Sequence, residues 1–468
     1  MVTQPRLVIA ATRSGEGKTT VATGLMAALR ASGLRVCAHK VGPDYIDPSY
    51  HAAATGRPGR NLDPWLTGTE QIAPLFLHGA RGADISIIEG VMGLFDGAAG
   101  RGDFASTAHV ARLLDAPIIL VLAANGAGRS IAATVHGFVS YAPDVRVAAV
   151  VLNQVSSPRH EQILREALAG TGIPVAGALP AEAILHTPSR HLGLVPAAER
   201  SAEVRDWLSP LRALVRDNLD LDLLTAIARA APTVAAPPWS PAFCHDLAQE
   251  AGPSSGAPVS VAIASGPAFT FGYAEHRELL AAAGAEVVEF DPMTAAELPA
   301  GTDALVVGGG FPQLYAADLA ANVALRAEVA SRVAAGMPVI AECAGLLWLG
   351  RELDRRPQCG VLPAAATMTG KLTLAYREAV ALATTPLAAA GTTVRAHEFH
   401  RTTSVPAHGT GAGAGAGAGA AWQLADGSRQ GWATPTLLAS YLHVHWAGLP
   451  SVAPRLLAAA ANSRAAHT

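Results

Sequence analysis

Residues 6–31 read RLVIAATRSGEGKTTVATGLMAALRA, and this stretch decides how the first half of the chain folds. It opens with a short, mostly apolar run, which is typical of a strand buried on both faces of a sheet. The middle part, TRSGEGKTT, is rich in glycine, and the last part, VATGLMAALRA, has the pattern of a helix. A strand, a glycine-rich loop and a helix in this order predict a phosphate-binding loop.

The loop departs from the pattern Gly-x-x-x-x-Gly-Lys-[Ser/Thr] at one position, because Thr12 stands where the first glycine is expected. The backbone N–H groups can still surround a phosphate at the start of the helix, where the helix dipole favours anions. We expect Lys18 to neutralise the β- and γ-phosphates of ATP and the Thr19 hydroxyl to bind Mg²⁺. A glycine-rich turn that only caps a helix is the alternative. The predicted ATP-binding residues are Ser14, Gly15, Gly17, Lys18, Thr19, Thr20 and Asn153.

Asn153 lies outside the loop, near the end of a later apolar run, VVLNQV. Its amide offers both a donor and an acceptor, which are the groups needed to read the edge of an adenine. An asparagine that simply ends a strand fits the pattern nearly as well.

Two acidic loops follow predicted strands. VGPDYIDPSYH carries Asp44 and Asp47, and IIEGVMGLFDG carries Glu89 and Asp96. Ligands of doubly wound sheets bind outside the carboxyl ends of the strands, so these carboxylates should lie near Lys18. There they can hold Mg²⁺ or orient a substrate. Turn formation is the alternative for Asp47, which precedes proline, and for Asp96, which precedes glycine.

Both halves of the chain alternate short Val/Ile/Leu runs with helical patterns, which predicts an α/β protein with mostly parallel, helix-covered sheets. A length of 468 residues exceeds what one core supports, so we expect two domains. Residues 1–230 form the first and residues 258–468 the second, and residues 231–257, rich in Pro, Ser and Gly, form a linker. Residues 409–420, a Gly/Ala repeat, are predicted to be a flexible surface loop.

The second half contains PVIAECAGLLWLG, in which an apolar run ends at Glu-Cys-Ala-Gly and a helical pattern follows. This is the pattern of a nucleophile elbow, with Cys343 where hydrolases use serine. The helix N-terminus predicts a lowered thiol pKa. Ala344, Gly309 and Gly310 are the predicted donors of an oxyanion hole. The alternative is that Cys343 is a buried small residue.

A cysteine nucleophile needs a base, and SYLHVHW near the end of the chain offers His443 and His445. Alternate residues of a strand share one face, so we expect both rings to approach the thiolate side by side. The other cysteines, Cys37, Cys244 and Cys359, are far apart in the sequence, lack metal-ligand spacing and suggest a reducing compartment.

Composition limits the partners. Charged residues make up 15% of the chain and the formal net charge is −3, which gives no case for binding nucleic acid. No apolar run is long enough to span a membrane, and no secretion signal is visible at the N-terminus. We therefore expect a cytoplasmic protein without membrane partners. A homodimer is a further expectation that no residue pattern decides.

Seven stretches occur in the order seen in the cobyrinate (hydrogenobyrinate) a,c-diamide synthase family, which the chain resembles along nearly its whole length. They are TRSGEGKTT, KVGPDYIDPSYH, EGVMGLFDG, GGGFPQLY, AECAGLLWLG, RAHEFHRTT and SYLHVHW. The resemblance implies a dethiobiotin-synthetase-like P-loop domain joined to a flavodoxin-like class I glutamine amidotransferase domain. It also implies a C–N ligase that uses ATP, Mg²⁺ and glutamine to amidate the a and c acetate carboxylates of a corrinoid in cobalamin biosynthesis.

The resemblance implies roles for individual residues. Cys343 would be the nucleophile and His443 the residue that activates it. Thr19, Glu89 and Asp47 would bind the metal. Asp44, Tyr45 and Asp96 would lie near the corrinoid carboxylate and the γ-phosphate.

Two departures qualify the resemblance. Most class I amidotransferases have a glutamate two positions after the catalytic histidine, whereas this chain has His445, so no third triad member is assigned. The Gly/Ala repeat looks like an insertion. The alternatives are a related glutamine-dependent synthetase, of the cobyric acid synthase or CTP synthase type, and a non-enzymatic P-loop switch with an inactive amidotransferase domain.

Overall fold

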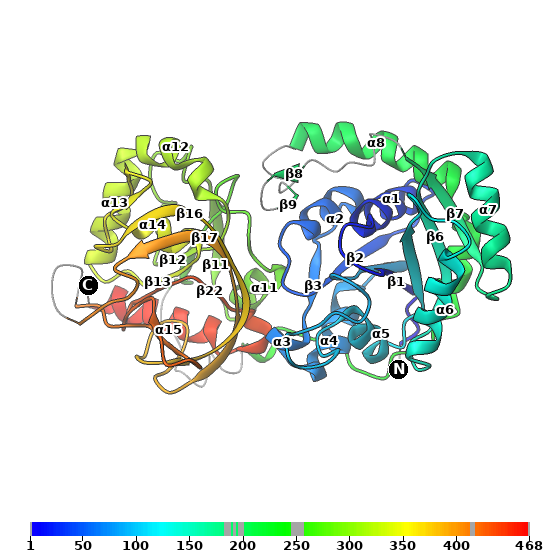
Figure 1. The fold of residues 1–468 in the computed structure, drawn as a ribbon. Helices are drawn as coiled ribbons and strands as arrows, with labels where there is room; N and C mark the ends of the chain where they lie inside the picture. Colours follow the sequence, from blue (N-terminus) through cyan, green and yellow to red (C-terminus); the bar gives the residue numbers. More distant parts are fainter. Residues whose placement is uncertain are drawn as a thin grey trace. The chain divides into compact units, whose positions relative to one another are not determined.

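The computed structural model divides into two compact units, Met1–Trp239 and Ser240–Thr468, which are described separately (Figure 1). Residues 245–256 of the predicted linker and residues 412–416 of the predicted Gly/Ala loop lie outside the described residues. The structure describes residues 2–181, 189–190, 193–194, 201–244, 257–411 and 417–466.

The first unit is built on a wholly parallel seven-stranded sheet in the order β3-β2-β4-β1-β5-β6-β7. Its central strands are almost entirely buried, as their continuous apolar runs predict. The separate pair β8 (Ser189–Arg190) and β9 (Gly193–Leu194) is antiparallel. The strands of the large sheet are β1 (Arg6–Ala11), β2 (Val36–Val41), β3 (Arg60–Leu62), β4 (Ile85–Glu89), β5 (Ile118–Ala123), β6 (Val147–Val155) and β7 (Val175–Pro180).

Helices cover both faces of this sheet: α1, α2 and α8 lie on one face and α4 and α5 on the other (Figure 1). Side chains at the N-cap position, just before the helix, fix several helix starts. The hydroxyls of Ser106 and Ser157 and the carboxylate of Asp220 accept hydrogen bonds from backbone N–H groups in the first turns of α5, α7 and α9. The helices are α1 (Lys18–Ala31), α2 (Asp47–Thr55), α3 (Pro64–Thr67), α4 (Ile72–Gly79), α5 (Thr107–Leu113), α6 (Ile131–Tyr141), α7 (Pro158–Ala169), α8 (Ser201–Asn218) and α9 (Leu221–Arg229).

The second unit has a mostly parallel six-stranded sheet in the order β11-β10-β12-β13-β21-β20, in which only the β20–β21 pair is antiparallel. The predicted fold class is therefore confirmed for both halves. The strands are β10 (Ser260–Ala264), β11 (Glu286–Phe290), β12 (Ala304–Val307), β13 (Val339–Glu342), β20 (Trp432–Thr434) and β21 (Leu437–Ser440), and the helices are α11 (Ala274–Ala282), α12 (Ala316–Ala321), α13 (Val323–Ala334), α14 (Ala344–Leu349) and α15 (Val452–Ala465).

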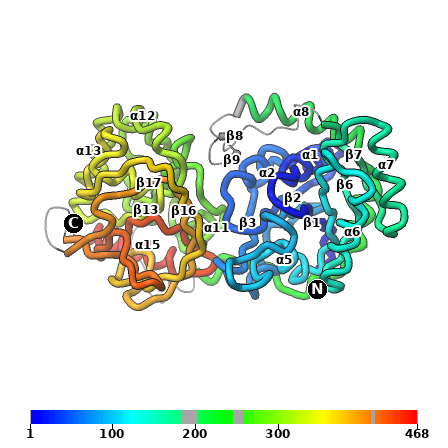
Figure 2. Tube along the Cα trace, in the orientation of Figure 1, coloured from blue at the N-terminus to red at the C-terminus, as the bar shows by residue number. Residues whose placement is uncertain are grey.

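A second, mainly antiparallel sheet in this unit was not predicted. Its two long strands, β16 (Ala365–Ala381) and β17 (Thr393–Val405), run beside each other (Figure 2). The short strand β22 (Leu442–His443) pairs with β17 and sets His397 opposite His443. The RAHEFHRTT stretch thus lies against SYLHVHW. The remaining strands are β14 (Glu352–Leu353), β15 (Arg356–Pro357), β18 (Trp422–Leu424) and β19 (Arg429–Gln430).

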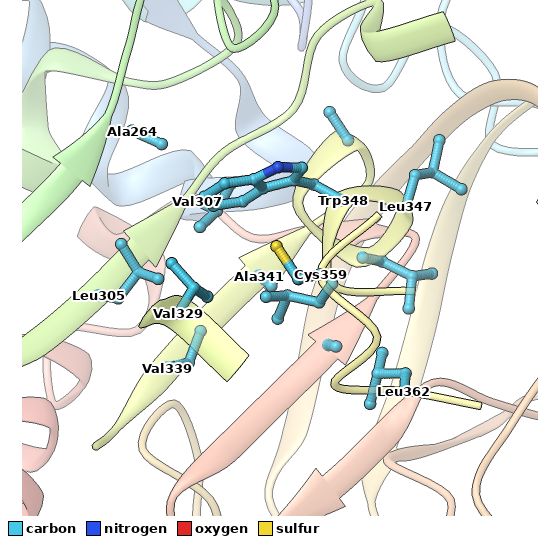
Figure 3. Packing of buried hydrophobic residues seen from close by; sticks show 14 of the residues in the cluster. Ala264, Leu305, Val307, Val329, Val339, Ala341, Leu347, Trp348, Cys359 and Leu362 are labelled. Atoms are coloured by element: carbon cyan, nitrogen blue, oxygen red, sulfur yellow. The ribbon is translucent and has the colours of Figure 1, made fainter. Parts of the chain in front are cut away.

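The core of the second unit supports the turn that carries Cys343. Trp348 of α14 is buried against Val307, and Cys359 lies in the same apolar cluster (Figure 3). Burial raises the pKa of the Cys359 thiol, as expected for a cysteine used as a small apolar residue. Since α14 is packed along its whole length, the elbow in front of it has little freedom to move.

Candidate active sites in the two units

The predicted phosphate loop connects β1 to α1 with two left-handed glycines. Gly15 has φ 84° and Gly17, at the N-cap of α1, has φ 93°. A Cβ on Gly17 would lie 2.2 Å from Nδ2 of Asn153, so a side chain is excluded there on two grounds. Ser14 and Gly15 are exposed, as a loop that receives a ligand must be.

Thr12, the departure from the P-loop pattern, closes the loop through a contact that the sequence did not predict. Its N–H donates to Oε2 of Glu16 at 2.9 Å, and its hydroxyl donates to Oε1 at 2.7 Å. The Glu16 side chain is buried. The two hydrogen bonds between Thr12 and Glu16 therefore fix the loop at the position where the P-loop pattern has its first glycine.

Asn153 also fixes the loop. Its Nδ2 donates to the Glu16 carbonyl at 2.9 Å, and its Oδ1 accepts from the Gln154 N–H at 3.0 Å. The structure thus gives the Asn153 amide a role in holding Glu16 and the neighbouring Gly17. The contact with adenine stays a prediction.

Lys18 connects the phosphate loop to the loop after β4. Its ammonium donates to the carbonyl of Met92 and, at 3.4 Å, to that of Arg13. Burial lowers the pKa of Lys18, and the nearby Lys40 ammonium lowers it further. An anion bound at this point would offset both effects.

The three predicted metal ligands come together around Lys40. The sequence pattern did not single out this lysine. The Lys40 ammonium lies 2.6 Å from Oδ2 of Asp47 and 2.9 Å from Oε1 of Glu89. The Thr19 hydroxyl donates to the same Glu89 oxygen at 2.6 Å. Nε2 of His51 lies 2.7 Å from the other Glu89 oxygen, Oε2. All the charged atoms of this cluster are buried.

Two carboxylates share one lysine in this cluster, and their pKa values separate as a result. Burial acts to raise the pKa of Glu89, but Lys40 and the hydrogen bonds from His51 and Thr19 outweigh it and lower the value. The pKa of Asp47 is raised by burial and by the neighbouring carboxylates. Attraction to both carboxylates raises the pKa of Lys40 in spite of burial. The shifts of Lys40 and Glu89 both favour the charged form of this pair.

We expect Lys40→Met to lower the free energy of unfolding by about 3–5 kcal/mol, because it leaves Glu89 and Asp47 buried without their cation. Urea unfolding of the purified protein measures this loss. The control is Arg35→Met, which removes an exposed ion pair with Asp84 and should change the unfolding free energy little. Equal losses in the two variants would contradict the assigned importance of Lys40.

The three predicted substrate residues differ in exposure. Oδ1 of Asp44 accepts hydrogen bonds from the N–H groups of Ile46 and Asp47, which sets the start of α2. Tyr45 is buried. Asp96 is exposed, and its Oδ2 accepts a hydrogen bond from the Gly93 N–H. Both aspartates thus form turns, which leaves their substrate contacts a prediction.

In the second unit, Cys343 occupies a strained turn between β13 and α14. Its φ of 50° and ψ of −97° lie in a region that non-glycine residues rarely adopt. Its N–H donates to the Ser440 carbonyl at 2.7 Å. A Cβ on Gly345 would lie 2.4 Å from the Val307 carbonyl oxygen, which explains why the elbow needs a small residue there.

The predicted lowering of the Cys343 pKa is wrong for this state of the protein. Burial raises the pKa of the thiol to about 12, and the neighbouring carboxylates Glu342 and Glu398 add to the effect. The N–H groups of Ala344 and Gly310 oppose the rise by hydrogen bonding to the sulfur. Desolvation outweighs the two hydrogen bonds because the thiol is almost completely enclosed. A base is therefore needed to form the thiolate.

His443 lies beside this turn, and a glutamate that the sequence analysis missed lies beside His443. Nδ1 of His443 is 3.9 Å from Oε2 of Glu342, the residue before Cys343. Both side chains are buried. Burial lowers the pKa of His443, and the His397 and His400 rings lower it further. No sequence spacing signals this pair, because it depends on the pairing of β21 with β13 and on the return of β22 to β17.

The expectation that His443 and His445 share one face is wrong, because the strand ends at His443. His445 lies with its ring centroid 4.1 Å from that of Tyr273 and its Nε2 3.7 Å from Oε2 of Glu275. It also accepts a hydrogen bond from the Ala447 N–H at 3.2 Å. His445 is a buried structural residue of this unit.

Comparisons with known proteins identify the family of each unit. Residues 7–195 match the model of the CobQ/CobB/MinD/ParA nucleotide binding domain, and residues 260–450 match that of the CobB/CobQ-like glutamine amidotransferase domain. The hydrogenobyrinate a,c-diamide synthase of Streptomyces coelicolor is 54% identical, over 97% of each chain. That of Mycobacterium tuberculosis (strain H37Rv) is 49% identical, over 97% of this chain and 98% of its own. The cobyrinate a,c-diamide synthase of Gloeobacter violaceus is 43% identical, over 94% and 93%.

The chain belongs to the a,c-diamide synthase family. The two matched ranges of this family member contain the phosphate loop and the Cys343 elbow, respectively. Within the described residues of this a,c-diamide synthase family member, no helix is long and apolar enough to cross a membrane.

Proposed function

We propose that this chain uses ATP and glutamine to amidate the a and c acetate carboxylates of hydrogenobyrinate or cobyrinate in cobalamin biosynthesis. The observation that carries the proposal is the presence, in one chain, of a phosphate loop with a buried lysine and of a cysteine elbow beside a buried histidine. The relatives whose names state this activity match the chain over nearly its whole length.

The second unit would release ammonia from glutamine. His443 takes the proton of the Cys343 thiol, and the thiolate attacks the side-chain amide carbon. The oxygen of the tetrahedral intermediate is stabilised by the N–H groups of Ala344 and Gly310, which already point at the sulfur. Ammonia leaves, and water hydrolyses the thioester to glutamate. Gly309 donates its own N–H to the Phe271 carbonyl, so we leave it out of the proposed oxyanion hole.

The first unit would activate the corrinoid carboxylate. A carboxylate resists attack by ammonia because it is negatively charged, so it first takes the γ-phosphoryl group of ATP and becomes an acyl phosphate. We assign to Lys18 the neutralisation of the charge that develops on the transferred group. The loop N–H groups from Ser14 onward would hold the phosphates at the start of α1. Ammonia then displaces phosphate and forms the amide.

The residues near Lys18 fit a Mg²⁺ ion. Thr19, Glu89 and Asp47 supply only hard oxygen donors, as this ion prefers, and they lie together around Lys40. Mg²⁺ usually keeps several waters and takes further oxygens from substrate phosphates, so a few protein ligands are enough. When bound, Mg²⁺ would neutralise phosphate charge. Thr19, Glu89 and Asp47 are the ligands we assign.

Gly309→Ala should reduce glutamine-dependent amidation by about a hundredfold or more, because the new Cβ would lie 2.4 Å from Cε1 of His443 and displace the base. Steady-state rates with glutamine and with ammonium chloride measure the effect. Only the glutamine rate should fall. The control is Gly272→Ala, whose Cβ would meet nothing within 4 Å. A parental glutamine rate in Gly309→Ala would contradict the placement of His443.

The stoichiometry of the reaction tests the proposed function. ADP and glutamate should each form in a one-to-one ratio with the amide groups added to the corrinoid. ADP formation should need the corrinoid, because the carboxylate is the phosphoryl acceptor. A nucleotide-dependent switch with an inactive amidotransferase unit would instead hydrolyse ATP without consuming glutamine.

A further inference from the structure

Glu342 is a buried acid that has no role in the reaction steps proposed above. It ends β13, immediately before the nucleophile candidate, and the residue is 7% exposed. Oε1 accepts a hydrogen bond from the Val444 N–H at 3.2 Å, and Oε2 lies 3.9 Å from Nδ1 of His443. A carboxylate is costly to bury unless it has a partner that makes use of its charge.

We propose that Glu342 is the positioning residue of His443 and takes the place of the glutamate that other class I amidotransferases carry two residues after the histidine. This inference rests on the proposed glutaminase reaction. The catalytic triad would then consist of Cys343, His443 and Glu342. Glu342 lies on β13, whereas the glutamate of other class I amidotransferases lies on the segment that follows the histidine.

The other charged groups near His443 have different partners. His397 faces it from β17, with ring centroids 6.3 Å apart. Glu398 is engaged on both oxygens, by Nε of Arg377 at 2.7 Å and by Nε2 of His400 at 3.0 Å. Among the described residues, Glu342 is therefore the carboxylate that ion-pair geometry places on His443.

The chemistry of the first step explains why such a carboxylate is needed. When the Cys343 proton moves to Nε2 of His443, the ring becomes positively charged inside a buried site. Burial lowers the pKa of His443, and thus opposes this charge. A carboxylate facing Nδ1 stabilises the imidazolium and fixes the ring so that Nε2 serves the thiol. Glu342 acts through His443 and does not contact the glutamine amide.

The ionisation of Glu342 gives this arrangement a signature. Burial raises the pKa of Glu342 to about 8, whereas the pKa of the Cys343 thiol is raised to about 12. The carboxylate forms as the pH rises through about 8. Its attraction for the His443 imidazolium should then outweigh its repulsion of the thiolate, so the reactivity of Cys343 should increase there, well below the pKa of the thiol itself.

The test measures the rate at which iodoacetamide labels Cys343 as a function of pH, with the labelled peptide quantified by mass spectrometry. Glu342→Gln should lose the rise near pH 8, label about tenfold or more slowly at that pH, and lose glutamine-dependent amidation to a similar extent. Glu342→Asp should keep the rise at a reduced rate. All variants should keep the parental rate with ammonium chloride, and their circular dichroism spectra should match that of the parent, which checks that the amidotransferase unit is folded.

The matched control is Glu275→Gln, which alters a second buried glutamate–histidine contact of this unit, that with His445. It should keep the parental pH profile. The proposal is overturned if Glu342→Gln keeps the rise near pH 8, or if Glu275→Gln loses it to the same degree. Failure of the parental protein to make the diamide would refute the proposed function, while the labelling profile would still decide the role of Glu342.

Discussion

Replacing Lys18 with alanine should abolish diamide formation with either nitrogen source, lowering both rates by about a hundredfold to a thousandfold. The ammonium of Lys18 is buried at the phosphate loop and is held by the carbonyls of Arg13 and Met92. Without it, the loop loses the buried ammonium that neutralises the charge of the transferred phosphoryl group. Initial rates of ADP and amide formation measure the loss, with glutamine and with ammonium chloride in separate assays.

Lys371→Ala is the control for this variant, because Lys371 is an exposed lysine of β16. It should keep the parental rates. Since ammonia bypasses the amidotransferase unit, a Lys18→Ala protein that retains activity with ammonium chloride would show that the phosphate loop is not the activating site.

Cys343→Ser should abolish amidation with glutamine and leave amidation with ammonia at the parental rate. A hydroxyl of ordinary pKa is a far weaker nucleophile than a thiolate, so glutamine can no longer form the covalent intermediate. The fall with glutamine should reach about a thousandfold or more. The measurement is the ratio of the two rates at saturating concentrations of each nitrogen source.

Cys359→Ala is the matched control, since Cys359 is a buried cysteine of the same unit that packs in the apolar core. It should lower stability while keeping the ratio of the two rates. Loss of both activities in Cys343→Ser would refute the division of labour between the two units.

The strand and helix pattern could be predicted well where the strands are buried on both faces. Strand β1 coincides with the apolar run that opens residues 6–31, and β6 ends where the run VVLNQV ends. The second sheet of the amidotransferase unit could not be predicted in the same way. Its strand β16 is largely exposed along its length and carries no continuous apolar run.

The candidate sites were predicted in part, for a comparable reason. Local sequence marks a loop or an elbow, so Lys18 and Cys343 stood out. Contacts between distant segments have no such mark: Lys40 reaches Glu89 from a neighbouring strand, and Glu342 meets His443 only because β22 returns to β17. The raised pKa of Cys343 also depends on burial in three dimensions, which its position before a helix does not reveal.

The most direct test of the account is to incubate the purified protein with ATP, Mg²⁺, glutamine and either hydrogenobyrinate or cobyrinate, and to separate the products by mass. We expect a corrinoid with two new amides, at the a and c acetates, formed with at least one of the two substrates. A product with four amides at other positions would indicate a cobyric acid synthase. The absence of any amidated corrinoid, with ATP still consumed, would contradict the account.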